Sequence, residues 1–268
     1  MSQRIVLNIS TDASPSAKRI DMTAADGVAV KIASLKHVAS PRTFVMKPGG
    51  GIEAKCRLTS KPMVTKGSPT ALQVEIVAGK PALAVNTASA GLVGLAFPAG
   101  SLTESYTIIY MVNVGAEAQS LPDASNLLSG FDAANVWLSN PLRYNGAGAT
   151  PADVFSSRGG DRTSPNTPTV PRVAGDWNLL VVDWNNTTRK VSIGVNSSTA
   201  ISSAIRSGGR IPASTDYLEI GYHLTSSGLH GSKVGDVFTF SSSLLSTPLG
   251  VQQATALVTA LKTEYGIA

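Results

Sequence analysis

The sequence predicts an all-β protein in which two antiparallel sheets pack as a sandwich, with one helix at the C-terminal end. Three observations support this fold class. The 268 residues include 25 Gly and 15 Pro, and only 15% are charged, which suits many short strands joined by turns. One stretch near the middle of the chain has the pattern of a long hairpin. The last twenty residues are the one stretch where apolar residues recur at helical spacing.

The hairpin is expected over residues 177–195. An apolar run from Trp177 to Trp184 meets a polar loop, Asn185 to Thr188. In residues 190–195 apolar and polar side chains then alternate, which is typical of strands that bury one face. The two tryptophans supply bulk for a sandwich core, so we expect the other strands to be laid against this hairpin.

The C-terminal helix is predicted to begin at Thr247 as the N-cap, with Pro248 at the first helical position, and to close at Gly266. Its apolar face consists of Val251, Ala254, Leu257, Val258, Leu261 and Tyr265.

Further strands are indicated by alternation or by apolar runs. We expect residues 116–175 to be rich in loops, with one clear strand at 135–139 and a long irregular loop over 158–171. The other expected strands are 4–9, 28–33, 52–58, 72–77, 81–85, 106–114, 217–222 and 234–240.

The net charge and the pattern of the sequence change near residue 70. Residues 1–80 hold 12 Lys/Arg against 5 Asp/Glu, a net of +7, so the remainder carries −2 of the total of +5. We therefore expect a basic, β-rich docking segment over residues 1–68 and a sandwich domain over 69–268. The basic residues are spread singly, which favours solvated strand faces or an acidic protein partner over nucleic acid.

Several kinds of chemistry find no support in the sequence. Cys56 is the single cysteine, so the chain forms no internal disulfide. We expect no cofactor and no metal, because neither the two loop histidines nor any acidic cluster supplies enough ligands. No run approaches 18 apolar residues, so we expect no membrane insertion. Asp161 could join a hydrolytic acid pair only through tertiary contact, and we expect no enzyme.

The order of features in the second part of the chain resembles a known family. The hairpin at Val77–Val85 is followed by the strand within 102–112, and a Gly-Asp strand at 235–240 precedes the helix that ends near Tyr265-Gly266. This order is similar to the concanavalin A-like lectin/glucanase jelly roll, in the laminin-G-like form common in bacteriophage structural proteins and bacterial surface proteins. The resemblance covers roughly residues 70–268. It implies a two-sheet jelly roll that binds glycans or serves as a structural module.

The chain departs from that family in two ways. The Glu-x-Asp-x-x-Glu strand of its glycosidases is absent, and so is the acidic cluster of the legume-type metal site. Catalysis and metal binding are therefore not implied.

Glycan binding would require an exposed aromatic ring beside amides, carboxylates or arginines. An alternative for Trp137 is a place in the core, because it alternates with Val136 and Leu138 in an expected strand. Tyr144 and Asn145 precede Gly146 in an expected turn. The candidates are Trp137, Tyr144, Asn145, Arg158, Asp161, Arg162, Tyr222 and His223.

Our first hypothesis is a non-enzymatic virion structural protein of a tailed bacteriophage, a tail appendage or head decoration that presents a lectin-like jelly roll. Its expected partners are other virion proteins, through the basic N-terminal segment, a host surface glycan, and further copies of itself in a homo-oligomer. The first residues lack the apolar stretch of a secretory signal, so we expect synthesis in the host cytoplasm. A free carbohydrate-binding module and a glycan hydrolase are the alternatives.

Overall fold

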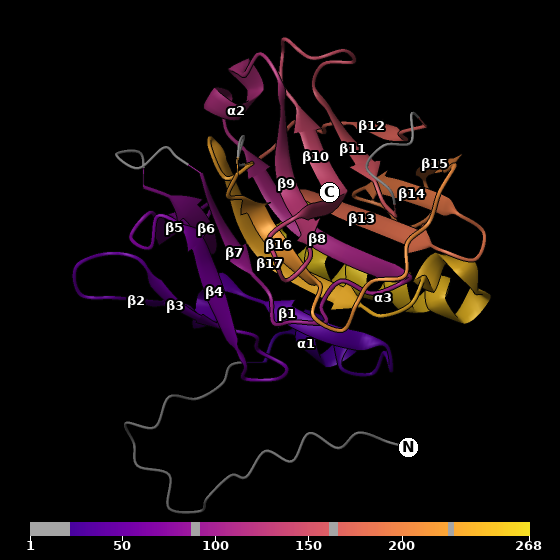
Figure 1. Ribbon diagram of the computed structural model, residues 1–268, viewed down its shortest axis with the longest axis horizontal. Helices are drawn as coiled ribbons and strands as arrows, with labels where there is room; N and C mark the ends of the chain where they lie inside the picture. Colours follow the sequence, from indigo (N-terminus) through magenta and orange to yellow (C-terminus); the bar gives the residue numbers. More distant parts are fainter. Residues whose placement is uncertain (1–21, 87–91, 161–165, 225–227) are drawn as a thin grey trace, which may run out of the picture.

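The computed structural model describes residues 22–86, 92–160, 166–224 and 228–268 (Figure 1). Within them the chain forms two antiparallel sheets stacked face to face, with helix α3 (Pro248–Tyr265) packed against one of them. In Figure 1, α3 lies behind strands of this sheet. The predicted all-β sandwich with a C-terminal helix is confirmed.

The first sheet has the order β15-β14-β13-β8-β17-β6-β5, with β1 paired to β17 as well. The predicted hairpin forms its strands β13 and β14, between β15 and β8; in it Val182 lies opposite Ile193 and Trp184 opposite Val191. The strands are β1 (Leu35–Ala39), β5 (Leu72–Val77), β6 (Lys80–Val85), β8 (Tyr106–Val114), β13 (Asn178–Asn185), β14 (Lys190–Val195), β15 (Ile201–Ile205) and β17 (Ser232–Phe240).

The second sheet has the order β12-β11-β10-β9-β16-β7-β4-β3-β2. Its strands are β2 (Val45–Met46), β3 (Ile52–Lys55), β4 (Pro62–Gly67), β7 (Val93–Ala96), β9 (Ala124–Phe131), β10 (Trp137–Asn145), β11 (Val154–Arg158), β12 (Thr169–Pro171) and β16 (Tyr217–Tyr222).

Two apolar layers hold the sheets and the helices together. The inner core, which contains Trp184, fills the space between the two sheets. The outer layer, which contains Trp177, lies between the first sheet and the helices α1 (Ala24–Ala29) and α3. Helix α3 begins and ends as predicted: the Thr247 hydroxyl accepts from the Gly250 backbone N–H at 3.1 Å, and Gly266 has φ = 68°.

The chain before residue 69 contributes strands to both sheets. Strand β1 pairs with β17, with Val38 opposite Phe238, and β4 pairs with β7 in the second sheet. Strands on both sides of the expected boundary therefore share the same two sheets. The docking role expected of residues 1–68 stays a prediction.

Two secondary-structure predictions were wrong. Residues 24–29, which overlap the strand expected at 28–33, form α1, because the Thr23 hydroxyl and the Asp26 carboxylate cap each other's backbone N–H. Residues 116–175 hold the short helix α2 (Ala116–Ser120) and four strands, β9 to β12, rather than mainly loops. The strand expected at 4–9 lies outside the described residues.

Ion pairs join the early chain to the C-terminal helix. Arg42, in the short 3-10 turn η1 (Pro41–Thr43), contacts Asp236 and Glu264 at 3.1 Å each. Arg57 pairs with Asp26 of α1 at 2.7 Å, and the Tyr265 hydroxyl donates to Asp236 at 2.9 Å. Burial raises the pKa of Glu264, and the Arg42 charge opposes that rise.

Candidate functional site

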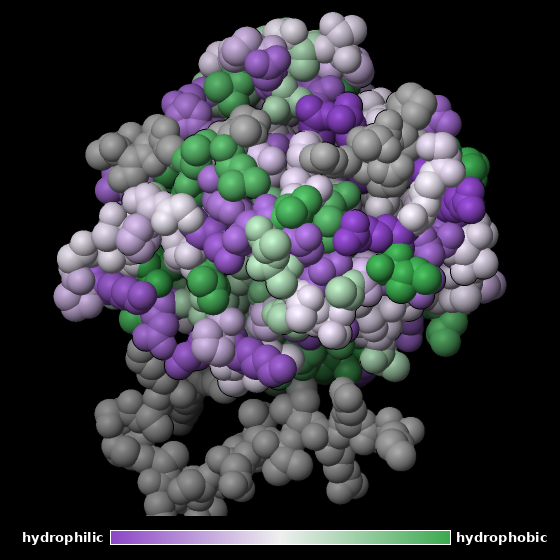
Figure 2. All heavy atoms as spheres, viewed as in Figure 1, coloured by the Kyte–Doolittle hydropathy of each residue, from purple (hydrophilic) through white to green (hydrophobic). Residues whose placement is uncertain are grey.

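The outer face of the second sheet is the candidate binding surface. The outer face of the first sheet is covered by α1 and α3. On the second sheet, Leu218 and Ile220 of β16 point into the inner core, so the alternate residues Tyr217 and Glu219 lie on the other face. Figure 2 shows one side of the molecule, on which hydrophobic residues form separate small patches among hydrophilic ones.

An aromatic cluster occupies this face: Phe131, Trp137, Tyr217, Tyr222 and His223. The Phe131 ring lies at its centre, with ring centroids 5.7 Å from Tyr217, 5.6 Å from Tyr222 and 5.0 Å from His223. Trp137 packs on Tyr222 at 5.3 Å and is partly exposed, whereas Phe131 is fully buried. Trp137 and His223 are therefore the partly exposed rings of this cluster, whereas Tyr217 and Tyr222 are buried.

Polar groups from two other segments, the β9–β10 loop and β4, border the cluster. The Tyr217 hydroxyl donates to the Asn135 side-chain oxygen at 2.7 Å, and Lys66 Nζ donates to the same oxygen at 3.2 Å. Lys66 Nζ also lies 5.0 Å from the centre of the Tyr217 ring. Burial, followed by the charges of Glu219 and Asp132, raises the pKa of Tyr217, so its hydroxyl stays protonated at neutral pH.

Glu219 is fully buried beneath this face. Its carboxylate accepts from the His223 backbone N–H at 2.9 Å, and its other oxygen lies 2.7 Å from His223 Nδ1. Room for the carboxylate exists because residue 94 is glycine: a Cβ at that position would meet Glu219 Oε1. Glu219 therefore fixes the orientation of the imidazole that lies against Phe131.

A polar strip continues the face along β9, β10 and β11. The register places Arg143 opposite Asn126 on one side and Ser156 on the other, and Arg158 opposite Asn140. The amides of Asn126 and Asn140 are hydrogen bonded to each other. The strip carries two cationic groups and several neutral hydrogen-bonding groups.

The structure brings some of the predicted site residues together and separates others. Trp137, Tyr222 and His223 belong to the aromatic cluster, and Arg158 lies on the same face. The interpretation that placed Trp137 in the sandwich core was wrong, because its neighbour Leu138 points into the inner core and Trp137 therefore lies on the outer face. Asp161 and Arg162 lie outside the described residues.

Tyr144 does not belong to this surface. Its ring is fully buried in the inner core against Phe155, and its hydroxyl donates to Asp153 at 2.6 Å. Burial, followed by this bond, raises the pKa of Tyr144 to about 12. Asn145 is 8% exposed and donates to the Pro151 carbonyl at 3.0 Å. Both residues end strand β10 and do not form the expected turn.

Other residues of the face were missed by sequence reasoning. Tyr217 and Glu219 could have been placed together from the alternation in Tyr217-Leu-Glu-Ile. Lys66 could not, because it reaches this face through the pairing of β4 with β7, and Phe131 meets Tyr217 only through the pairing of β9 with β16. Arg143 lies in the same strand as Trp137, but the irregular register between Ser139 and Leu142 hides which face it takes.

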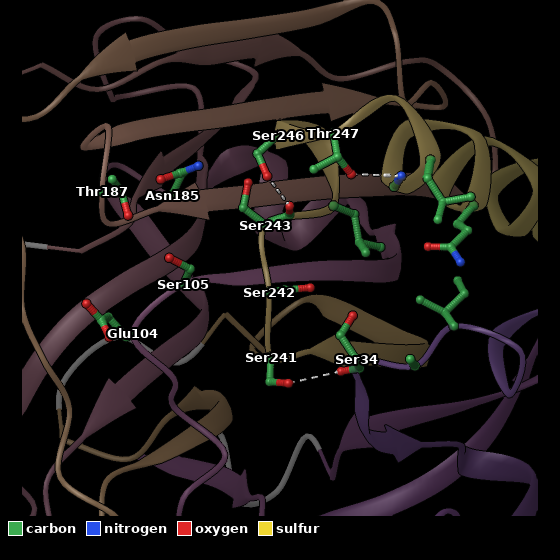
Figure 3. Close-up of a pocket in the computed structure, with 16 residues that line it drawn as sticks. Ser34, Glu104, Ser105, Asn185, Thr187, Ser241, Ser242, Ser243, Ser246 and Thr247 are labelled. Atoms are coloured by element: carbon green, nitrogen blue, oxygen red, sulfur yellow. Dashed lines mark hydrogen bonds between the residues drawn. The ribbon is translucent and has the colours of Figure 1, made fainter. Parts of the chain in front are cut away.

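A second hollow lies at one end of the sandwich and has a volume of about 590 Å³ (Figure 3). Hydroxyl groups dominate its lining, and none of the described residues that line it is aromatic. Two of the labelled hydroxyls donate to backbone carbonyls: Ser246 to that of Ser243 at 2.6 Å and Ser241 to that of Ser34 at 3.3 Å. The hollow offers many hydrogen bonds but no ring on which a sugar could stack.

The described residues contain no group of three or more His, Cys, Asp or Glu side chains that could hold a metal ion. No helix among them is long and apolar enough to cross a membrane.

Comparison with known proteins identifies similar folds. No family profile matches the chain, and no curated protein matches it by sequence. A Trypanosoma rangeli sialidase in complex with sialic acid is similar at a TM-score of 0.54 and 15% identity over 87% of this chain, which spans 33% of the sialidase. The binding domain of botulinum neurotoxin DC, in complex with SialylT, has a TM-score of 0.50 and 10% identity over 87% of this chain and 52% of that one.

Domain 4 of AbnA, an extracellular arabinanase from Geobacillus stearothermophilus, in complex with arabinotriose, has a TM-score of 0.50 and 14% identity. The match covers 84% of this chain and 98% of that domain. At these identities the likeness concerns the fold alone: this chain has the β-sandwich fold shared by parts of a sialidase, a toxin binding domain and an arabinanase domain.

Proposed function

We propose that this chain is a non-enzymatic carbohydrate-binding protein that holds glycans on the outer face of its second sheet. The observation that carries the proposal is the partly exposed Trp137 ring packed on Tyr222. A sugar can stack its apolar side on such a ring, because aromatic side chains combine large contact area with a polar rim. Three proteins of similar fold, solved in complex with sialic acid, SialylT or arabinotriose, support this proposal.

The arrangement around Trp137 suits a sugar ligand. Asn135 and Lys66 lie next to the cluster and can share hydrogen bonds with hydroxyl groups. Tyr217 and His223 are held by Asn135 and Glu219, so binding costs little side-chain ordering. The hollow of Figure 3 lacks such a ring, which favours the sheet face over it.

The test is a glycan array probed with the full chain, followed by titration of the best ligand. Trp137→Ala should weaken binding at least about 10-fold, as expected when an aromatic anchor of about 1.4 kcal/mol or more is lost. Ile76→Ala is the matched control, because Ile76 is a large apolar residue, 69% exposed, on β5 of the other sheet. Loss of binding in Gln253→Ala, which changes the hollow, with Trp137→Ala unaffected would overturn the assignment.

The absence of catalysis is part of the proposal and has its own test. We expect no release of reducing ends when the best-binding polysaccharide is incubated with the protein. Turnover that disappears in Glu219→Gln would instead make the chain a hydrolase.

We further propose that the protein is a structural component of a tailed bacteriophage virion, as a tail appendage or head decoration, and that it assembles as a homo-oligomer. The support is the family resemblance of residues 70–268 and the net charge of +7 over residues 1–80, which suits docking on acidic virion proteins. An antibody against the chain should label purified particles. A protein found free of particles in infected cells would favour the alternative of an independent carbohydrate-binding module.

A further inference from the structure

Two arginines share the polar strip of the second sheet without an acidic neighbour in the strands around them. Arg143 of β10 lies opposite Ser156 of β11, and Arg158 follows Ser156 by two residues on the same face. The two cationic side chains are therefore diagonal neighbours on adjacent strands. The residues paired with them on this face are neutral: Asn126, Asn140 and Ser156.

The charges of this pair are uncompensated within the described part of the chain. No ion pair or hydrogen bond there engages either guanidinium, and the Nε atoms of both are buried without a partner. Burial, followed by the charge of Arg158, lowers the pKa of Arg143 to about 10. Two like charges held in partial burial cost folding free energy that an anion between them would recover.

The chemistry of the pair selects the kind of anion. Guanidinium groups present planar pairs of N–H donors that match carboxylate, sulfate and phosphate oxygens. The surrounding amides and hydroxyls add hydrogen bonds without adding negative charge. Ser129 and Ser156, on the same face, each have a buried hydroxyl without a partner among the described residues.

The position of the pair relative to Trp137 indicates what carries the anion. Asn140, opposite Arg158, is three residues along β10 from Trp137, which is about 10 Å at the rise of an extended strand. A single oligosaccharide lying along β10 can thus contact both the ring and the arginines.

We propose that Arg143 and Arg158 form an oxyanion subsite that makes the protein selective for acidic glycans, with a sugar carboxylate or sulfate ester at the arginines and a neighbouring sugar on Trp137. This inference rests on the proposed glycan binding. The shared chemistry is the oxyanion, and the experiment below separates its two sources.

The test compares three polysaccharides by calorimetric titration of the full chain: polygalacturonate for carboxylate, heparin for sulfate, and dextran as a neutral reference. Wild-type protein should bind one of the acidic polymers at least about 10-fold more tightly than dextran, and the tighter of the two identifies the source. The double variant Arg143→Gln/Arg158→Gln should lose that preference while its melting temperature stays the same or rises.

The matched control is Arg189→Gln/Lys190→Gln, which also removes two positive charges, but at the β13–β14 connection of the first sheet. It should keep the preference for the acidic polymer. If both double variants bind the acidic polymer equally weakly, net charge alone explains the preference, and the subsite proposal is overturned. Binding of acidic and neutral polymers with equal affinity would overturn it as well.

A second readout separates this inference from the proposed function. Thermal shifts with free glucuronate and with inorganic sulfate are measured for wild type and for both double variants. If no polysaccharide binds but one anion raises the wild-type melting temperature and not that of Arg143→Gln/Arg158→Gln, the subsite stands and glycan binding fails. If polysaccharides bind through Trp137 but neither anion has an effect, the subsite fails and the glycan proposal stands.

Discussion

Arg42 Nη2 lies 3.1 Å from Asp236 Oδ2, although the two residues are 194 positions apart in sequence. The Asp236 side chain is 1% exposed and also accepts from the Tyr265 hydroxyl, so the contact joins η1, β17 and α3 at one point. The early basic chain is thereby tied into the sandwich.

Replacing Arg42 should therefore destabilise the whole sandwich. Arg42→Ala leaves the buried Asp236 without its cation, and we expect a loss of about 3 kcal/mol in the free energy of unfolding. Chemical denaturation measures it. The control is Lys55→Ala, which breaks an exposed pair with Glu53 and should cost much less, because water screens both charges. Equal losses would show that the Arg42 contacts contribute no more than a surface pair.

Gly94 can be tested as the residue that makes room for Glu219. In Gly94→Ala the new methyl group meets the Glu219 carboxylate, which must leave its place beside His223. We expect a loss of about 1–3 kcal/mol, as for other overpacked sites. Gly27→Ala, in helix α1 with open space around it, should be neutral or stabilising by up to about 1 kcal/mol. A Gly94→Ala protein as stable as wild type would contradict the steric argument.

His37 should make stability depend on pH. It is 4% exposed, and burial, followed by the charges of Lys36 and Lys61, lowers its pKa from 6.5 to about 4. Between these values the unfolded chain binds a proton that the folded chain does not, so this contribution to stability is present above pH 6.5 and lost toward pH 4.

The size of that contribution is about 3 kcal/mol between pH 7 and pH 4. His37→Gln removes the titrating group, so denaturation at the two pH values should show a difference smaller than that of wild type by this amount. Parallel pH profiles for the two proteins would contradict the prediction.

Tyr144 should matter for stability and not for binding. Tyr144→Phe keeps the ring against Phe155 but loses the bond to Asp153, which still pairs with Arg172 at 2.7 Å. We expect a loss of about 1 kcal/mol in unfolding free energy and unchanged affinity for glycan. If Tyr144→Phe weakens glycan binding and leaves the stability unchanged, Tyr144 belongs to the binding site and the prediction is contradicted.

The elements with the strongest periodicity were the most predictable from sequence. Hairpin 177–195 and helix α3 carry their own signals: an apolar run, a polar loop and an alternating strand in the first, and a cap, a proline and a closing glycine in the second. Strands β9 and β10 did not, because register irregularities place Leu127 and Leu128 together in the inner core and disturb the alternation around Trp137.

The candidate site was predictable only in part, for a related reason. Trp137, Tyr222 and His223 stand out by residue type. Their neighbours Phe131 and Lys66 come close to Tyr217 through pairings between strands distant in sequence, and the face that Arg143 takes depends on a register irregularity in β10. Residue type and local spacing reveal neither. For a tyrosine such as Tyr144, the residue type alone does not tell whether the side chain faces a ligand or the core.

The helices on the first sheet also determine how the molecule is oriented when it is attached to a surface. Helix α3 ends at Tyr265, and Ile267 after it packs on the outer apolar layer, so the C-terminal residues lie on the side opposite Trp137. A tether at residue 268 would leave the aromatic surface directed outward. Immobilised through a C-terminal tag, such proteins would be oriented alike, and many weak contacts with one polymer could add up to tight adhesion.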